Sequence, residues 1–458
     1  MKIFLDMVGC RLNQAEIEAY ARQLVSLGYT LVGNPEEADL AVVNSCSVTS
    51  AAASDSRQKV RQLWRKGVAE ITLTGCWATL NPESAAGLPG VQRIIPNNRK
   101  DDLVPEMFSL PKETFDLEPT ERQPIPGERL RTRAFIKVQD GCDNRCAFCI
   151  TTIARGRGRS RPIPDVLADI QAACSTRGGS SAKEVVLTGV HMGSWGRDLA
   201  PDLNLVDLVR SVLDDAGAER LRLSSIEPWH LDEDFFRLWE NPRLCRQLHL
   251  PLQSGSAAVL RRMARGVTPG EYAHLVRTAR DMIPGVAVTT DIIAGFPGES
   301  EAEFIESLQF IEEMGFAGGH VFTFSARDGT SAASMPAQVP LQTRKIRNAR
   351  IRQALEKSSA DYRRNFLGST LPVLWESALQ NGPNTWKLSG LTDNYLRVTC
   401  HAPGDLSNQI TPVLLQRLDG QGISGVIEPG WAAPGSGDRY RRKSDPAKFQ
   451  PGPGLSYE

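Results

Sequence analysis

The feature that most constrains the fold is a short cysteine motif directly after a predicted β-strand. Cys142, Cys146 and Cys149 lie in the string GCDNRCAFC, and the apolar residues 134–138 precede it. Three thiolates on one loop can hold three irons of a [4Fe–4S] cluster, whose full ligation normally takes four cysteines. One iron would stay open for a ligand. A zinc site is the alternative, but zinc motifs favour paired CxxC units with a fourth ligand, and none lies nearby.

The chain around this motif alternates between apolar strands and amphipathic helices. We predict strands at 134–138, 183–189, 220–225, 246–252, 286–295 and 318–324, with helices between them and a long helix over 341–368. Such alternation is typical of parallel sheets. About six βα units predict an open or partial barrel, whose site lies at the carboxyl ends of the strands. The cysteine motif stands at the first of these ends.

Residues 1–110 show the same alternation and carry three more cysteines. Cys10, Cys46 and Cys76 each come after a predicted strand. In an open parallel α/β sheet the carboxyl ends of the strands share one crevice, where ligands bind. We therefore expect the three thiols to converge there on a second cluster, again with one free iron. The alternative is three unrelated core cysteines, since free cysteine is often buried.

The end of the chain differs in composition. Short strands are predicted at 371–377, 385–391, 395–402 and 422–429, between turns rich in glycine, asparagine and proline, which favours a small β-barrel. Residues 111–132 read as a linker. The tail 431–458 is rich in proline and glycine, and we expect it to be disordered.

Composition restricts the class of protein. A chain of 458 residues with 41% hydrophobic residues suits two or three domains. Nine cysteines, spaced widely and odd in number, argue against a disulfide framework. The start MKIFLDMVGC lacks a signal peptide, and no apolar run could span a membrane. We expect a soluble cytoplasmic protein with no membrane partner. Lys+Arg and Asp+Glu are equal at 53 each, so only local basic runs point to nucleic acid.

The cysteine loop resembles the signature of the radical S-adenosylmethionine (SAM) family. The resemblance implies that the open iron binds SAM, that a reduced cluster cleaves SAM to a radical, and that Phe148 packs near the adenine. The segments 187–196, 223–228, 251–256 and 289–300 resemble the SAM-contacting loops of that family. A turn or capping role is the alternative for their polar residues. The residues implied as SAM contacts are Phe148, Gly189, Ser225, Glu227, Gln253, Ser254, Asp291 and Gly295.

The strings GCRLNQAEIEA (9–19) and VVNSCSVTSAA (42–52) resemble the N-terminal domain of the radical SAM methylthiotransferases. This resemblance spans about residues 1–430. It implies a flavodoxin- or Rossmann-like α/β domain (1–110), a partial (β/α)6 radical SAM core (128–360), a small TRAM β-barrel that binds RNA (361–430), and the tail (431–458). It also implies two [4Fe–4S] clusters and SAM as cofactors, with the Cys10/Cys46/Cys76 cluster supplying sulfur.

The implied reaction is methylthiolation of C2 of adenosine-37 in tRNA. The motifs look most like the type that acts on threonylcarbamoyladenosine, although Thr151, Thr152 and Ile153 replace a usual Ile-Pro-Tyr-like stretch. Prenylated adenosine, or an aspartate of a ribosomal protein, are alternative substrates, and a non-catalytic iron–sulfur RNA-binding or sensor protein is an alternative class.

Partners follow from the same resemblance. They are tRNA and an electron donor such as flavodoxin or ferredoxin. The residues predicted to bind RNA are Arg155, Arg157, Arg159 and Arg161 through phosphates, and Trp375, Trp386 and Tyr395 through stacking, with core packing as the alternative for the aromatics.

Overall fold

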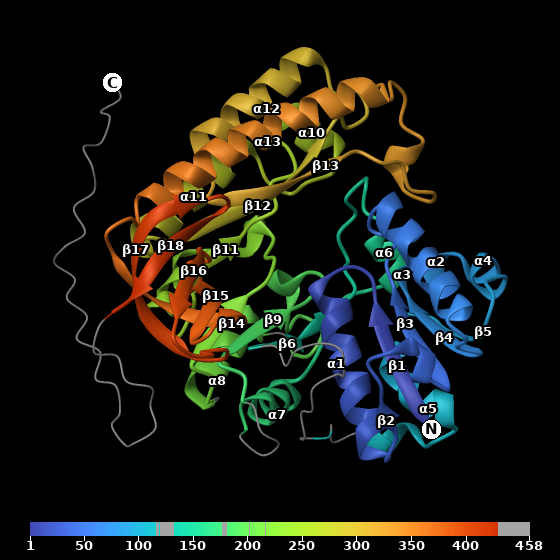
Figure 1. The fold of residues 1–458 in the computed structure, drawn as a ribbon. Helices are drawn as coiled ribbons and strands as arrows, with labels where there is room; N and C mark the ends of the chain where they lie inside the picture. The colour runs from blue at the N-terminus through green and yellow to red at the C-terminus, as the bar shows by residue number, and fades with distance from the viewer. Residues whose placement is uncertain (116–118, 120–131, 176–180, 201, 216, 429–458) are drawn as a thin grey trace, which may run out of the picture.

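The computed structural model describes residues 1–115, 119, 132–175, 181–200, 202–215 and 217–428. Its three parts are an N-terminal α/β unit, a central partial barrel and a C-terminal closed barrel (Figure 1). Most of the predicted linker, and the tail, lie outside the described residues. The domain boundaries stay predictions, and the one at 361 falls inside the helix α13 (Leu341–Arg364).

The N-terminal unit is a parallel sheet with strand order β2-β1-β3-β4-β5. This is the flavodoxin-like order, in which the chain switches direction between β1 and β3. Helices cover both faces of the sheet, α1 and α5 on one and α2, α3 and α4 on the other. The elements are β1 (Lys2–Met7), α1 (Arg11–Ser26), β2 (Thr30–Leu31), η1 (Pro35–Glu37), β3 (Leu40–Ser45), α2 (Ser50–Arg65), β4 (Glu70–Gly75), α3 (Cys76–Leu80), α4 (Pro82–Ala86), β5 (Val91–Ile95), η2 (Lys100–Asp102), α5 (Leu103–Phe108) and η3 (Lys112–Phe115).

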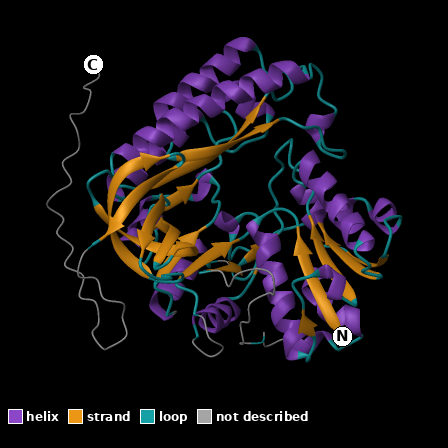
Figure 2. Ribbon diagram, in the orientation of Figure 1, coloured by secondary structure: helices purple, strands orange, loops and turns teal. Residues whose placement is uncertain are grey.

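The central part contains all six predicted barrel strands. They form two parallel sheets, β10-β9-β6 and β11-β12-β13, which an isolated bridge between Ser225 and His249 joins into one curved wall. Helices lie along the outside of this wall (Figure 2). The strands are β6 (Arg133–Lys137), β9 (Glu184–Thr188), β10 (Arg220–Leu223), β11 (Gln247–His249), β12 (Ala287–Ala294) and β13 (Gly318–Thr323).

The helices of the central part are α6 (Thr151–Arg155), α7 (Ile163–Cys174), α8 (Leu205–Asp215), α9 (Glu233–Arg237), α10 (Ala257–Arg262), α11 (Pro269–Met282), α12 (Glu301–Met314) and α13, with the 3-10 turns η4 (Met192–Ser194), η5 (Pro228–His230), η6 (Leu238–Glu240) and η7 (Ser331–Ala333). Most of these helices pack on one large apolar core, and α10 packs on a smaller one through Val259. A short antiparallel ribbon, β7 (Gln139–Asp140) and β8 (Arg159–Ser160), flanks the cysteine loop.

The C-terminal part is a closed barrel with strand order β14-β15-β16-β18-β17. Its strands are β14 (Thr370–Gly382), β15 (Thr385–Thr392), β16 (Arg397–Ala402), β17 (Ile410–Asp419) and β18 (Gly422–Ile427). The small barrel was predicted, but β17 was not. Proline is uncommon inside strands, and Pro412 of β17 lies opposite Pro372 of β14 in the register of that pair.

Direct contacts hold the three parts together. The helix α1 packs against β6, where Ala15, Phe135 and Val186 form a small apolar cluster. The guanidinium of Arg246 donates to Asp393 of the C-terminal barrel at 2.8 Å. Among the described residues, no helix is long and apolar enough to cross a membrane.

Candidate active site

Cys10, Cys46 and Cys76, called here the first triad, lie at the carboxyl ends of β1, β3 and β4, as predicted. The triad therefore sits at the switch point between β1 and β3, where doubly wound sheets bind ligands. Gly9 makes the approach possible. With φ of 116°, it places its Cα so close to Cys46 that an added Cβ would lie 2.6 Å from the Cβ and 2.7 Å from the Sγ of Cys46.

Two asparagines contact the thiols of the first triad. The Cys10 thiol donates to Asn13 Oδ1 at 3.7 Å, and Asn97 Nδ2 donates to the sulfur of Cys76 at 3.5 Å. Burial raises the pKa of the Cys46 thiol to about 11, and the neighbouring Cys10 and Cys76 thiols contribute to the rise. A buried thiol such as that of Cys46 needs a positive partner to ionise, and iron would supply it.

Cys142, Cys146 and Cys149, called the second triad, share the loop after β7. Gly141 starts the loop with φ of 74° and lies against Arg157, whose carbonyl oxygen would be 1.9 Å from an added Cβ. The Asn144 amide donates to the Cys142 sulfur at 3.4 Å, and Arg265 Nη1 donates to the Cys146 sulfur at 3.7 Å. Burial also raises the pKa of the Cys142 thiol to about 11.

The number of thiols in each triad matches a [4Fe–4S] cluster with one open iron. Within the described ranges, no three histidine, cysteine or carboxylate side chains converge as ligands of one ion. In a cubane each thiolate binds a different iron, so the sulfurs can lie further apart. Each triad supplies three thiols and would leave one iron open.

The loops at the barrel strand ends close around the second triad. Gln139 Oε1 accepts hydrogen bonds from the amides of Val190 and His191, which seats the Gly189 loop beside the ribbon that precedes Cys142. Phe148 packs edge-on to Phe296 at 6.5 Å between ring centroids, next to Gly295. The predicted SAM segments around Gly189 and Gly295 are thus brought to the cysteine loop.

Other predicted SAM contacts have partners within the protein. Glu227 accepts a hydrogen bond of 2.6 Å from Arg265, and Ser225 forms the bridge to β11. Asp291 pairs with His249 at 3.3 Å, while its Oδ1 atom is buried without a hydrogen-bond partner. Glu227 and Asp291 remain candidates for holding a polar cofactor.

Two candidates at the end of β11 differ in their suitability. The backbone of Gln253 is left-handed, with φ of 74°, and its amide donates to Asp291 O at 2.8 Å. Ser254 is buried and directs its hydroxyl at Ser307 of α12, 3.4 Å away. Because α12 covers the outside of the barrel, the structure does not support a SAM contact for Ser254.

The arginine run after the second triad divides into buried and exposed members. Arg157 and Arg159 are exposed, whereas Arg161 binds Asp169 at 2.6 Å and is only partly exposed. Arg155 is 3% exposed, so the prediction that it grips RNA phosphates is wrong. Burial would lower its pKa, but Glu16, Cys76, Asp140 and Cys10 together raise it well above the ordinary value.

The three aromatic residues of the C-terminal barrel that were predicted to pack in its core or stack on bases lie in different surroundings. Trp375 is fully buried in the barrel core and donates from Nε1 to Thr411 at 2.9 Å, so it cannot stack on a base. Tyr395 accepts a hydrogen bond of 2.6 Å from Arg11, beside Cys10, and therefore links this barrel to the N-terminal unit. Trp386 is half-buried against the barrel core.

Sequence reasoning missed several residues that contact the triads. Arg265 places a buried positive charge next to Cys146. Its neighbours in the sequence do not distinguish it from the other arginines of the chain. Asn13 could have been found, because it follows Cys10 by one helical turn in α1.

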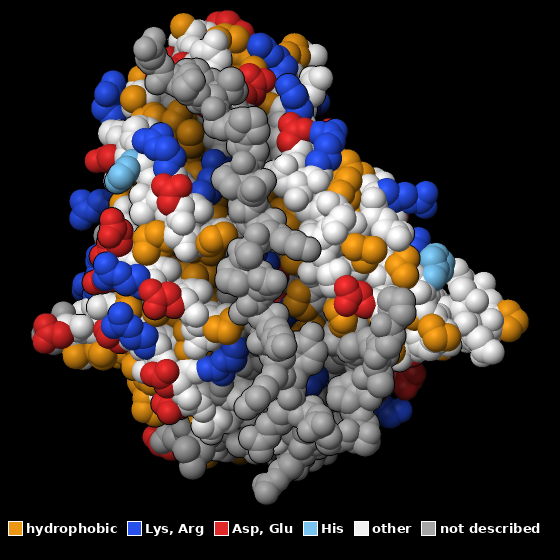
Figure 3. All heavy atoms as spheres, turned by 90° about the vertical axis from the view of Figure 1, so that its left-hand side faces the viewer, with side chains coloured by type: hydrophobic (Ala, Val, Ile, Leu, Met, Phe, Trp, Pro, Cys, Tyr) orange, Lys and Arg blue, Asp and Glu red, His pale blue; other side chains and the backbone are white. Residues whose placement is uncertain are grey.

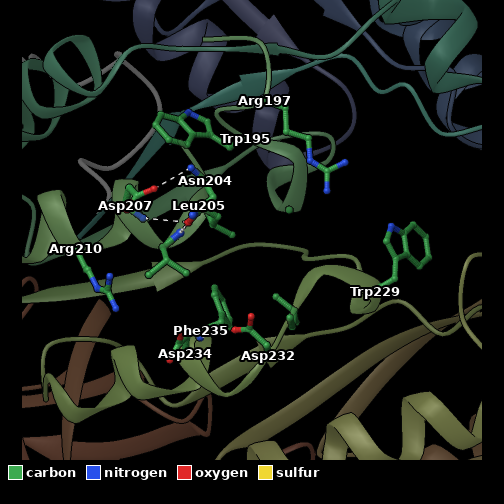
Figure 4. A pocket seen from close by; sticks show the side chains of 13 residues that line it. Trp195, Arg197, Asn204, Leu205, Asp207, Arg210, Trp229, Asp232, Asp234 and Phe235 are labelled. Carbon is green, nitrogen blue, oxygen red and sulfur yellow. Dashed lines mark hydrogen bonds between the residues drawn. The ribbon is translucent and has the colours of Figure 1, made fainter. Parts of the chain in front are cut away.

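A cavity of about 540 Å³ lies between the loops that follow β9 and β10 and the helices α8 and α9 (Figure 4). Its lining includes Trp195 and Asp207 on one side and Asp232 and Phe235 on the other. Trp229 also lines it, and the Arg265 guanidinium, which contacts Cys146, lies 4.4 Å from the centroid of the Trp229 ring. The cavity is thus separated from Cys146 by these two stacked side chains.

Family models match two parts of the chain. Residues 136–311 match the "Radical SAM superfamily", and residues 2–95 match the "Uncharacterized protein family UPF0004". A solved structure of the radical SAM methyltransferase TsrM from Kitasatospora setae superposes with a TM-score of 0.54 at 14% identity, covering 72% of this chain and 77% of that one. The family match over residues 136–311 identifies this part of the chain as a radical SAM domain.

Relatives that match over most of both chains show which radical SAM family this is. The Chlamydia pneumoniae protein named "Threonylcarbamoyladenosine tRNA methylthiotransferase MtaB" is 35% identical over 427 residues, which cover 92% of this chain and 97% of that one. The Clostridium tetani "tRNA-2-methylthio-N(6)-dimethylallyladenosine synthase" is 32% identical, covering 85% and 88%. The chain belongs to the radical SAM methylthiotransferase family. Membership confirms SAM and [4Fe–4S] chemistry as predicted.

Proposed function

We propose that this enzyme attaches a methylthio group to C2 of threonylcarbamoyladenosine-37 in tRNA. The observation that carries the proposal is the presence of two three-cysteine sites connected by direct contacts. Asn97 Nδ2, which donates to Cys76, also donates to Ala154 O at 2.8 Å, in the helix that follows the second triad. The 35% identical relative carries the name of this activity.

The division of labour follows from the two sites. The second triad would hold the cluster that binds SAM, and the first triad would hold the cluster that supplies sulfur. Bound there, the cofactors supply radical chemistry, which a C–H bond without useful acidity requires. The protein positions them and excludes water. Arg265 keeps a buried positive charge at Cys146, and Gln139 orients the Gly189 loop.

A surface between the two triads suits the substituted base. Val48 follows Cys46 and is 53% exposed, and Ile153 follows Cys149 and is 51% exposed. Gly329 approaches Ile153, whose Cδ1 would lie 3.3 Å from an added Cβ. Exposed apolar side chains beside both triads could pack against a flat base.

Arg327 favours a substituent that carries a carboxylate. Its Nη2 donates to Val48 O at 3.5 Å, and its Nε is buried without a hydrogen-bond partner. No carboxylate of the described residues forms an ion pair with it. Partial burial lowers the pKa of this guanidinium, whereas the nearby Cys46 thiol and the Asp328 carboxylate raise it. A threonylcarbamoyl group offers the negative charge that would compensate this half-buried cation, and a prenyl group does not.

Exposed Arg157 and Arg159 are the proposed phosphate contacts. On the face that carries the C-terminal barrel, Lys and Arg side chains are interspersed with Asp and Glu (Figure 3). The described residues that are visible on that face therefore form no continuous basic stripe.

The test is anaerobic reconstitution with SAM, reductant, sulfide and tRNA carrying threonylcarbamoyladenosine, followed by digestion and nucleoside mass spectrometry. We expect a methylthio mass gain on that nucleoside. Cys149→Ala should abolish SAM cleavage. Cys46→Ala should abolish the mass gain yet still release 5′-deoxyadenosine. Full product from Cys46→Ala would refute the role of the first triad.

Prenylated adenosine is the second candidate, because Val48 and Ile153 are apolar and the Clostridium tetani relative bears that name. A mass gain on tRNA carrying prenylated adenosine, with none on threonylcarbamoyladenosine, would establish this alternative.

A further inference from the structure

Four charged side chains are buried where the N-terminal unit meets the barrel. Glu16 of α1 and Lys100 of η2 come from the first part, and Asp140 of β7 and Arg155 of α6 come from the second. We call them the buried charge cluster. Lys100 Nζ lies 2.5 Å from Glu16 Oε1 and 3.5 Å from Asp140 Oδ2. Burial would raise the pKa of both carboxyls, but Lys100 and Arg155 hold both below their ordinary values.

Arg155 contacts both parts with one guanidinium. Its Nη1 donates to Asp140 Oδ1 at 2.8 Å and to Glu16 Oε1 at 3.2 Å, and its Nη2 donates to Asn13 Oδ1 at 2.8 Å. Arginine is suited to this arrangement because its donors form a planar fork with fixed angles.

Two hydrogen-bond partners of Arg155, Asn13 and Asp140, each contact a residue of a triad or a residue next to one. Asn13 Oδ1 also accepts from the Cys10 thiol, and Asn13 Nδ2 donates to Ser45 O, the carbonyl before Cys46. Asp140 Oδ1 also accepts from the amide of Gly141, the residue before Cys142. One side chain therefore lies between the two cysteine sites, connected to each through one further residue.

We propose that Arg155 is a positioning residue that sets the placement of the first triad relative to the second and stabilises the negative charge of the first. This proposal about Arg155 rests on the proposed function, in which the first triad holds a cluster. In the transfer reaction, the substrate carbon must meet groups held at both sites. A misplacement of about 1 Å can lower a rate about 100-fold. A cation near the thiolates also favours the reduced, more negative state of a cluster, because net charge tunes reduction potential.

Arg155→Met removes the charge and the fork, and Arg155→Lys restores only the charge. Lys100 remains beside Glu16 and Asp140 in both variants, which limits the destabilisation from unpaired carboxylates. Arg222→Met is the matched control. It removes an equally buried guanidinium from a carboxylate, Glu184, at the interface with the C-terminal barrel.

The full chain is reconstituted, and iron and sulfide content, cluster EPR spectra and the reduction potential of each cluster are measured. The ratio of methylthio product to 5′-deoxyadenosine is also measured. Cys46→Ala identifies the signal of the first triad. For Arg155→Met we expect a lower potential of that signal, an unchanged second-triad signal, and a product ratio reduced about 10- to 100-fold. Arg155→Lys should restore most of the potential but not the ratio. Arg222→Met should change neither.

Wild-type potentials and a wild-type product ratio in Arg155→Met would overturn the proposal. If that variant does not fold, Arg155→Lys decides, since a wild-type ratio there would show that the fork has no positioning role. Failure of the proposed function looks different, because the wild-type chain would then show no first-triad signal or no methylthio product.

Discussion

Gly9→Ala should remove the first-triad cluster while leaving the second. The added Cβ would lie 2.6 Å from the Cβ and 2.7 Å from the Sγ of Cys46, a separation that real Cβ contacts do not show. Gly9 also has φ of 116°, where an alanine costs about 1–3 kcal/mol in strain. Relief of the clash requires Cys46 to move, and Cys46 is buried at the end of β3 with little free space.

Gly28→Ala separates strain from the clash. Gly28 has φ of 82° in the same unit, but no atom lies within 4 Å of its added Cβ. In denaturant titrations of the cluster-free chain, Gly28→Ala should lose about 1–3 kcal/mol of unfolding free energy from strain alone, and Gly9→Ala should lose more because of the added clash. Only Gly9→Ala should also lose about half of the iron and sulfide after reconstitution, taking two four-iron clusters as the reference. SAM cleavage without product should persist. Full iron content in Gly9→Ala would refute the placement of the first triad.

Two further predictions test the substrate surface. Arg327→Met should lower kcat/KM for threonylcarbamoyladenosine tRNA about 10- to 100-fold, the equivalent of losing a hydrogen bond to a charged group. Any activity on prenylated tRNA should be unaffected, and equal losses on both substrates would contradict carboxylate recognition. Replacing Arg157 and Arg159 together by alanine should weaken tRNA binding and reduce the slope of log K against log salt by about 1 per residue. Filter binding at several salt concentrations measures this, and an unchanged slope would exclude both arginines as phosphate contacts.

Most strands, and the positions of the six predicted cluster cysteines at strand ends, were predictable because each depends on local pattern plus one topological rule. A cysteine after a parallel strand lies at the shared edge of the sheet, whatever separates it in sequence from the next. Cys10, Cys46 and Cys76 meet for that reason. The strand β17 was missed because Pro412 is atypical of a strand, and only its place in a closed barrel explains it.

The roles of the arginines were not predictable, because burial is decided by the partners that tertiary structure brings. In the run 155–161 every arginine has similar neighbours in sequence. The helix α6 ends at Gly156, whose φ of 75° turns the chain, so Arg155 stays inside and Arg157 points outward. Two partners of Arg155, Glu16 and Asn13, come from α1, more than a hundred residues away in the sequence. Trp375 illustrates the same limit, since its partner Thr411 belongs to the unpredicted strand.

The cysteine positions were predictable and the arginine roles were not for one physical reason. Each triad is built by the unit that carries it, from strand ends and glycine turns that local sequence encodes. The distance between the triads is not determined by either unit alone. It depends on contacts between the units, in which Glu16, Asn13 and Lys100 of the N-terminal unit pair with Arg155 and Asp140 of the central part. An unmatched buried charge would be strongly destabilising, whereas the matched set fixes one docking geometry. The residues that position the two sites relative to each other should therefore be sought among buried polar pairs between the units. In the sequence such a residue can resemble a nucleic-acid contact, as Arg155 does within its basic run.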